Sequence, residues 1–270
     1  MEFIFYIFAG AGVGLAVGIT GVGGGSLMTP LLILFGIPYH IAIGTDLLYA
    51  GITKSGGVYA HSKLGTVRWD LVLLLASGSI PGALLTTLFL DAIFTDAGDY
   101  EGLLTSSLGI MLIITALVLL FKGRLQKTGR APSRLMSWTY THAREITVLA
   151  GLVLGVLVTL SSVGAGAFCA ALLLVLYPRM PALHVIGTDI AHAVPLTLIA
   201  GIGHLTLNNS DAYSFWVVGN VDFQLLGCLL VGSLPAVLLG AKLGAHLPSK
   251  LLQSVLAAIL MLLGLKFSFF

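Results

Sequence analysis

The chain has 270 residues, of which 57% are hydrophobic and only 9% are charged, and its mean hydropathy is +1.05. This composition is too apolar for the surface of a soluble globular domain, so we expect neither a soluble enzyme nor a nucleic-acid partner. The net charge of +2 says little by itself, because the membrane topology is inferred from where the charges lie along the chain. Long apolar runs without the alternating period of a β-barrel predict α-helices that span a lipid bilayer.

Ten apolar segments follow one another along the chain. They lie at 3–20, 23–36, 41–60, 69–90, 102–121, 146–162, 165–177, 183–203, 221–241 and 250–268. A transmembrane helix needs about 20 apolar residues. Segments 23–36 and 165–177 are therefore too short to span and are expected to be half-membrane or re-entrant elements. The pattern predicts an all-α polytopic membrane protein.

Basic residues gather in alternate connections between these segments. They are Lys63, Arg68, Lys122, Arg124, Lys127, Arg130, Arg134, Arg144, Arg179, Lys242 and Lys250. The opposite connections carry Asp91, Asp96, Asp99 and Glu101, or Asn208, Asn209 and Asp211, without Lys or Arg. The positive-inside rule then places the connection 122–144 in the cytoplasm and both termini outside.

Four short motifs occur twice, in the same order and in corresponding segments. Residues 19–25 correspond to 160–166, 43–46 to 186–189, His61 to His204, and 78–81 to 232–235. This recurrence predicts a first transmembrane repeat at 1–121, a basic linker at 122–144 and a second repeat at 145–270. Because each repeat holds an odd number of segments, the second would enter the membrane from the opposite side, which is typical of secondary transporters. Each inverted repeat would open with a broken or re-entrant helical hairpin.

Each predicted hairpin tip presents the start of a short helix. Unpaired backbone N–H groups and the helix dipole favour anions at such a position. Glycines permit close approach of a ligand, and nearby hydroxyls add hydrogen-bond donors. The candidate substrate-binding residues are Thr20, Gly23, Gly24, Gly25, Ser26, Ser161, Ser162, Gly164, Ala165 and Gly166. The alternative is that these small residues only permit close helix crossings.

Ionisable residues inside the apolar segments form a second candidate group. A charged side chain facing lipid at the bilayer centre costs about 2.5–3.5 kcal/mol, so these groups must face protein or a wet cavity. We expect Thr45, Asp46, Lys54, Thr188, Asp189 and His192 to support the tips or to carry a coupling proton. The alternatives are that each Asp caps a helix start and that Lys54 extends to the membrane surface. His61 and His204 are expected at the membrane interface.

The two cysteines, Cys169 and Cys228, lie in apolar stretches and lack the spacing of a metal site. We expect them to be core residues, and we expect no metal and no cofactor.

The motif from Gly18 to Gly25, followed by Pro30, Leu31 and Leu32, resembles the TauE/SafE family of bacterial sulfite and organosulfur-anion exporters. The Gly44-Thr45 pair and the repeat at 155–189 extend the resemblance over nearly the whole chain. The second copy departs from the first, because Ala165 replaces a glycine and no proline lies opposite Pro30. The resemblance implies export of sulfite, sulfoacetate or a related sulfonate across the bacterial inner membrane.

These observations together predict a secondary transporter that works by alternating access and is not an enzyme. Four alternatives remain open: a thiosulfate importer that uses cysteines, a small-carboxylate transporter, a passive anion channel, and an intramembrane hydrolase. The hydrolase would use Ser161 or Ser162 with His192 or His204. The substrate, the transport direction, the coupling ion (protons are one candidate) and the oligomeric state are not determined by the sequence.

Overall fold

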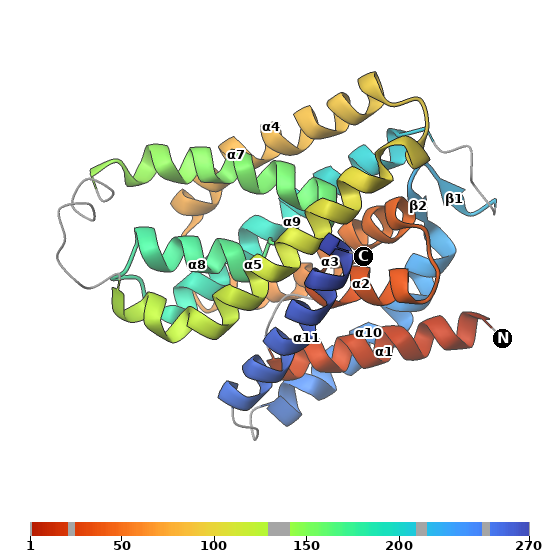
Figure 1. Ribbon diagram of the computed structural model, residues 1–270. Helices are drawn as coiled ribbons and strands as arrows, with labels where there is room; N and C mark the ends of the chain where they lie inside the picture. Colours follow the sequence, from red (N-terminus) through yellow and green to blue (C-terminus); the bar gives the residue numbers. More distant parts are fainter. Residues whose placement is uncertain (1, 21–24, 129–140, 209–214, 245–248, 270) are drawn as a thin grey trace.

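The computed structural model describes residues 2–20, 25–128, 141–208, 215–244 and 249–269 (Figure 1). In these residues the chain forms ten α-helices, one 3₁₀ helix and one small hairpin. The helices are α1 (Glu2–Thr20), α2 (Gly25–Leu34), α3 (Tyr39–Lys63), α4 (Trp69–Ile93), α5 (Glu101–Thr128), α7 (Ala143–Ser161), α8 (Ala167–Leu176), α9 (Ala182–Thr206), α10 (Phe223–Gly244) and α11 (Ser249–Phe269). The 3₁₀ helix η1 is Ala97–Tyr100, and strands β1 (Val217–Val218) and β2 (Val221–Asp222) pair antiparallel.

The ten predicted segments all correspond to helices, and this confirms the all-α polytopic fold. Helix α5 continues to Thr128, past the predicted end of its segment at 121. The extension is rich in Lys, Arg, Leu and Gln, which are good helix formers, so the helix continues where the apolar run stops. Within the described residues, five long apolar helices have the length and composition to cross a membrane, and they are α4, α5, α7, α9 and α10.

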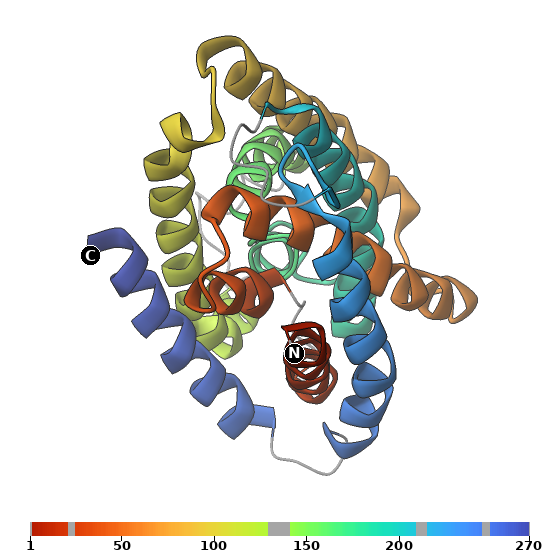
Figure 2. The same ribbon diagram turned by 90° about the vertical axis from the view of Figure 1, so that its right-hand side faces the viewer.

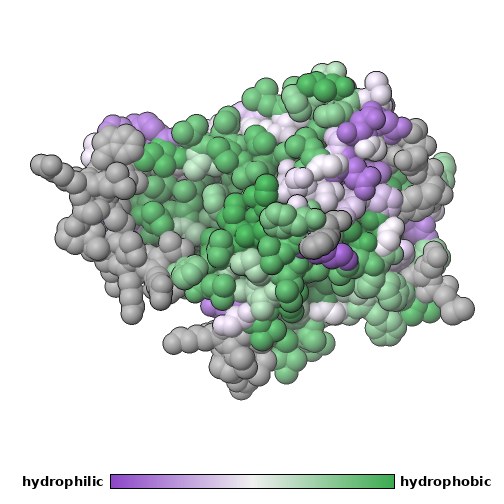
Figure 3. Space-filling model, viewed as in Figure 1, coloured by the Kyte–Doolittle hydropathy of each residue, from purple (hydrophilic) through white to green (hydrophobic). Residues whose placement is uncertain are grey.

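The surface is apolar in the manner of a protein that faces lipid. Large side chains from several helices are exposed, for example Phe8, Leu73, Leu238 and Leu262. Figure 3 shows hydrophobic residues covering most of the described surface on this face, with hydrophilic residues gathered towards its two ends. Exposure on this scale would promote aggregation in water. The chain is therefore a multi-pass membrane protein.

Helices α2 and α8 have ten residues each. At a rise of 1.5 Å per residue each is about 15 Å long, which is half of the roughly 30 Å hydrocarbon thickness. Figure 1 shows α8 towards the end of the molecule where α7 begins, and α2 towards the end where the N-terminus lies. These are the two segments that the sequence predicts to be too short to span.

The first helix of each predicted repeat packs on the fourth helix of the other. Helix α1 packs along α10, and α7 packs along α4, whereas α3 and α9 pack on each other in the interior (Figure 2). Glycines bring these backbones together: a Cβ on Gly14 would lie 2.7 Å from Ser233 Cα, and one on Gly155 would lie 2.9 Å from Ser79 Cα. Gly14 and Ser79 correspond to Gly155 and Ser233 in the repeat alignment, so the two contacts are equivalent.

Two further pairs of contacts follow the same correspondence. The backbone N–H of Asp222 donates to Thr45 Oγ1 at 3.0 Å, and the backbone N–H of Arg68 donates to Thr188 Oγ1, also at 3.0 Å. His61 Nδ1 contacts the Thr66 hydroxyl at 2.8 Å, and His204 Nδ1 contacts the Asn220 amide nitrogen at 3.3 Å. Thr45 and Thr188 are the threonines of the two Gly-Thr-Asp motifs. Each of them thus links its own helix to the start of the fourth helix of the other half. These contacts support the repeat, and its inverted orientation stays a prediction.

Candidate functional site

Asp46 lies in the interior between the two halves. Its Oδ2 accepts hydrogen bonds from the Thr29 hydroxyl of α2 at 2.5 Å and from the Ser162 hydroxyl, at the end of α7, at 2.9 Å. The side chain is fully buried, and its Oδ1 has no hydrogen-bond partner among the residues that the structure describes. One carboxylate oxygen therefore joins the two halves, and the other remains available to a proton or a ligand.

Lys54 lies two turns further along α3 and reaches the second hairpin tip. Its ammonium donates to the carbonyl of Ala165 at 2.8 Å. The ammonium also interacts electrostatically with the carboxylates of Asp189 and Asp46. The alternative that Lys54 extends to the membrane surface is therefore wrong, because a carbonyl and two carboxylates inside the protein attract the ammonium.

The second tip is a tight backbone turn between α7 and α8. Ser162 has a left-handed conformation (φ 57°), and Gly164 has φ 114°, a value that favours glycine. The Gly166 N–H donates to the Gly164 carbonyl at 2.7 Å, and α8 then begins at Ala167 without a side-chain cap. The turn thereby presents the start of α8, with its partial positive charge, beside the Lys54 ammonium.

The candidate hydroxyls of this tip already have protein partners. Ser161 donates to the Leu157 carbonyl at 2.6 Å, and Ser162 donates to Asp46. His192 contacts Ser79, so no described contact joins these serines to a histidine as the hydrolase alternative requires.

Only part of the first tip is described. Gly23 and Gly24 lie outside the described residues. Thr20 ends α1 and Gly25 begins α2, while the adjacent Ser26 is buried. The proposed ligand contacts of this tip stay predictions.

Asp189 and His192 meet at Cys169, the third residue of α8. The Asp189 carboxylate lies beside the Cys169 thiol. His192 Nδ1 is 3.7 Å from Cys169 Sγ, and His192 Nε2 is 2.8 Å from the Ser79 hydroxyl of α4. Thr188 is on the same helix but bonds to the Arg68 backbone instead. The structure thus joins Asp189 and His192 but places Thr188 in a separate contact.

Comparison with known families identifies the chain. The family described as "Sulfite exporter TauE/SafE" matches residues 6–267. The chain belongs to the TauE/SafE family.

Relatives of this TauE/SafE protein are described as probable membrane transporter proteins. The YjnA protein of Bacillus subtilis (strain 168) is 39% identical over 260 residues, covering 96% of this chain and 97% of the relative. YdhB of the same organism is 30% identical over 226 residues, 82% of each chain. A relative in Methanocaldococcus jannaschii is 25% identical over 235 residues, 85% of this chain and 80% of its own. No solved structure matches. The protein is therefore a membrane transporter.

The structure also corrects two simpler interpretations of this TauE/SafE chain. Helix α3 starts at Tyr39 after Pro38, so Asp46 lies two turns inside the helix and does not cap it. Asp189 is equally deep in α9, which starts after Pro181. His204 is fully buried and contacts the Thr159 carbonyl at 2.9 Å, so its expected place at the membrane interface is wrong.

Two polar partners of the site were missed by the sequence interpretation. Thr29 stands in a largely apolar short segment, where its own hydroxyl was the only signal. Ser79 belongs to the repeated Gly-Ser-Xaa-Pro motif, and that repetition could have marked it. Among the described residues, no group of three or more His, Cys, Asp or Glu side chains is arranged to hold a metal ion.

Proposed function

We propose that this protein is a secondary transporter that exports a small sulfur-containing anion, such as sulfite, sulfoacetate or another organosulfonate, by alternating access. It would act in the bacterial inner membrane, with the basic linker 122–144 in the cytoplasm and both termini outside. The observation that carries the proposal is the contact between the Lys54 ammonium and the Ala165 carbonyl. This contact places a cation at a buried helix start inside a membrane protein.

Lys54 and the start of α8 together suit an oxyanion. An ammonium has three N–H donors, and one is used by Ala165. The first turn of a helix offers backbone N–H groups, and its dipole attracts negative charge. A compact anion between the Lys54 ammonium and the N–H groups of Ala167 and Phe168 would receive donors from both. This geometry supports an anionic substrate, and the family name supports a sulfur oxyanion.

Charge balance in the same cluster supports coupling to protons. Lys54 carries one positive charge, and Asp46 and Asp189 carry two negative charges when ionised. The site would then have a net charge of −1 and would repel an anion in its low-dielectric surroundings. We infer that the carboxylates take up protons as the anion binds, with Asp46 Oδ1 as the first acceptor. Net flux then follows the combined gradients of anion and proton, and a high cytoplasmic anion concentration drives export.

A hydrogen bond between the two halves supports alternating access. Asp46 of α3 accepts hydrogen bonds from Thr29 of its own half and from Ser162 of the other half. A change in the protonation of Asp46 would alter the hydrogen bonds that join α2 to the second tip. Opposed halves that share such a contact can expose a central site first to one side and then to the other.

A ligand panel tests the proposed function. We expect sulfite or a sulfonate to raise the unfolding temperature of the purified protein, because a ligand at 100 times its Kd stabilises by about 2.7 kcal/mol. The same anion should show saturable exchange in reconstituted vesicles. Stabilisation by acetate or thiosulfate alone would assign a different substrate. Flux that does not saturate would indicate a channel.

A further inference from the structure

A cavity of about 580 Å³ lies where the end of α8, the start of α9 and the start of α4 meet. Its polar wall is formed by Arg68, Tyr177, Arg179 and His184, and leucine, methionine and proline side chains complete it. In the predicted topology this cavity faces the cytoplasm, because Arg68 and Arg179 belong to the basic connections.

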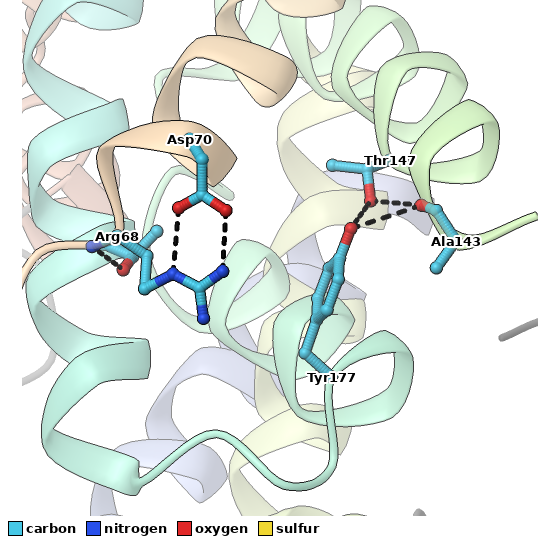
Figure 4. A network of polar contacts seen from close by, with 6 residues as sticks. Arg68, Asp70, Ala143, Thr147 and Tyr177 are labelled. Carbon is cyan, nitrogen blue, oxygen red and sulfur yellow. Dashed lines mark hydrogen bonds and ion pairs between the residues drawn. The ribbon is translucent and has the colours of Figure 1, made fainter.

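Two of these four side chains are held by neighbours. Figure 4 shows the Arg68 guanidinium facing both oxygens of Asp70, with Nε and Nη2 donating at 2.9 and 2.6 Å. The Tyr177 hydroxyl points to α7, where it contacts the Thr147 hydroxyl at 2.9 Å. These contacts neutralise Arg68 and fix Tyr177 as part of the wall.

The other two side chains, Arg179 and His184, differ in their exposure. Arg179 is exposed and has no acidic partner among the described residues, where the single ion pair is Arg68–Asp70. His184 Nδ1 is buried and has no hydrogen-bond partner within the described part of the chain. The cavity therefore presents one cation, Arg179, that no described carboxylate compensates, and a guanidinium at a cavity wall suits an oxyanion.

The wall of the cavity contacts α9, the helix that carries Asp189. His184 precedes Asp189 by five residues on α9, a rise of about 7.5 Å along the helix. Thr188, which lies between them, accepts the hydrogen bond from the Arg68 backbone at 3.0 Å. Through this bond the cavity wall is joined to the residue that precedes Asp189 on α9.

The corresponding positions in the other half, which face the opposite side of the membrane in the predicted topology, lack this positive charge. By the repeat alignment, Arg68 corresponds to Asp222, Arg179 to Gly36 and His184 to Ile41. At these three aligned positions the arginines are therefore present in one half and absent from the other.

We propose that the Arg179 cavity is an anion-collecting vestibule, which gives the transporter a higher apparent affinity for its substrate anion from the cytoplasmic side than from the outside. The inference rests on the proposed function and its orientation. An uncompensated cation at a mouth raises the local anion concentration and the association rate, and salt weakens both effects.

The test compares inside-out with right-side-out membrane vesicles, using radiolabelled sulfite at low ionic strength. Arg179→Gln should raise the KM measured from the cytoplasmic face by about fivefold, as expected for loss of one nearby charge. The maximal rate and the KM from the outside should stay unchanged. High salt should raise the cytoplasmic KM of the wild type and have a smaller effect on the variant.

Lys63→Gln is the matched control. Lys63 is an exposed cation on the same predicted side of the membrane, but its ammonium lies 4.5 Å from the centroid of the Tyr59 ring and does not line the cavity. An equal KM change in both variants would show a general surface-charge effect and overturn the vestibule.

Vesicles made without anionic lipid separate a substrate site from a lipid-headgroup site. The Arg179→Gln effect should persist in them, and its disappearance would assign the cavity to a lipid phosphate and overturn the proposal. Absence of sulfite transport by the wild-type protein would instead contradict the proposed function.

Discussion

Replacing Lys54 with methionine is expected to lower the kcat/KM of anion transport by about 100-fold, which corresponds to about 2.7 kcal/mol. Methionine keeps much of the side-chain volume but removes the cation that bonds to Ala165 at the second tip. The substrate would then face the Asp46 and Asp189 carboxylates without a compensating charge. Transport in reconstituted vesicles, normalised to the amount of folded protein, measures the effect.

Two further variants separate this role from a structural one. Lys54→Arg keeps the positive charge and should retain part of the transport activity. Lys63→Met removes an exposed cation from the last turn of the same helix, and it should transport like the wild type. Wild-type transport by a folded Lys54→Met protein would exclude Lys54 from the substrate site.

Asp46→Asn is expected to remove the dependence of transport on the proton gradient. The asparagine oxygen can still accept from Thr29 and Ser162, so the contact between the halves should persist. Its amide cannot release a proton and therefore resembles the protonated carboxyl. We expect anion uptake driven by an imposed pH gradient to fall about tenfold or more, while exchange of anion for anion continues.

Asp70→Asn serves as the control for this substitution. Asp70 is exposed and pairs with Arg68 outside the central cluster, and its loss should leave the response to pH unchanged. Gradient-driven uptake that survives in Asp46→Asn would show that another group carries the proton.

The sequence predicted the helices well because hydrophobic length is a strong local signal. The short α2 and α8 and the repeated Gly-Thr-Asp motif were all visible in the chain. The hairpin at 217–222 was missed, although Gly219-Asn220, with a φ of 55° at Gly219, is a dipeptide that favours a tight turn. Its two-residue strands are too short to show an alternating pattern.

The sequence predicted site residues only where the residue type by itself requires a polar partner inside the membrane. Asp46 and Asp189 were recognised because a carboxylate inside an apolar segment is costly. Their partners were not, because Thr29 and Ser162 lie 17 and 116 residues from Asp46 in the chain. The partner of Lys54 was missed for the same reason: its acceptor is 111 residues away, and a position near a helix end suggested the membrane surface as an alternative.

The location of a bound anion tests the central claim most directly. Selenite has the shape and charge of sulfite, and selenium can be located by anomalous diffraction from crystals of the unlabelled protein once selenite transport has been shown. We predict a selenium peak within hydrogen-bonding distance of Lys54 Nζ and the first N–H groups of α8, and no such peak in Lys54→Met. A peak elsewhere in a transport-competent protein, with none beside Lys54, would contradict this assignment of the substrate site.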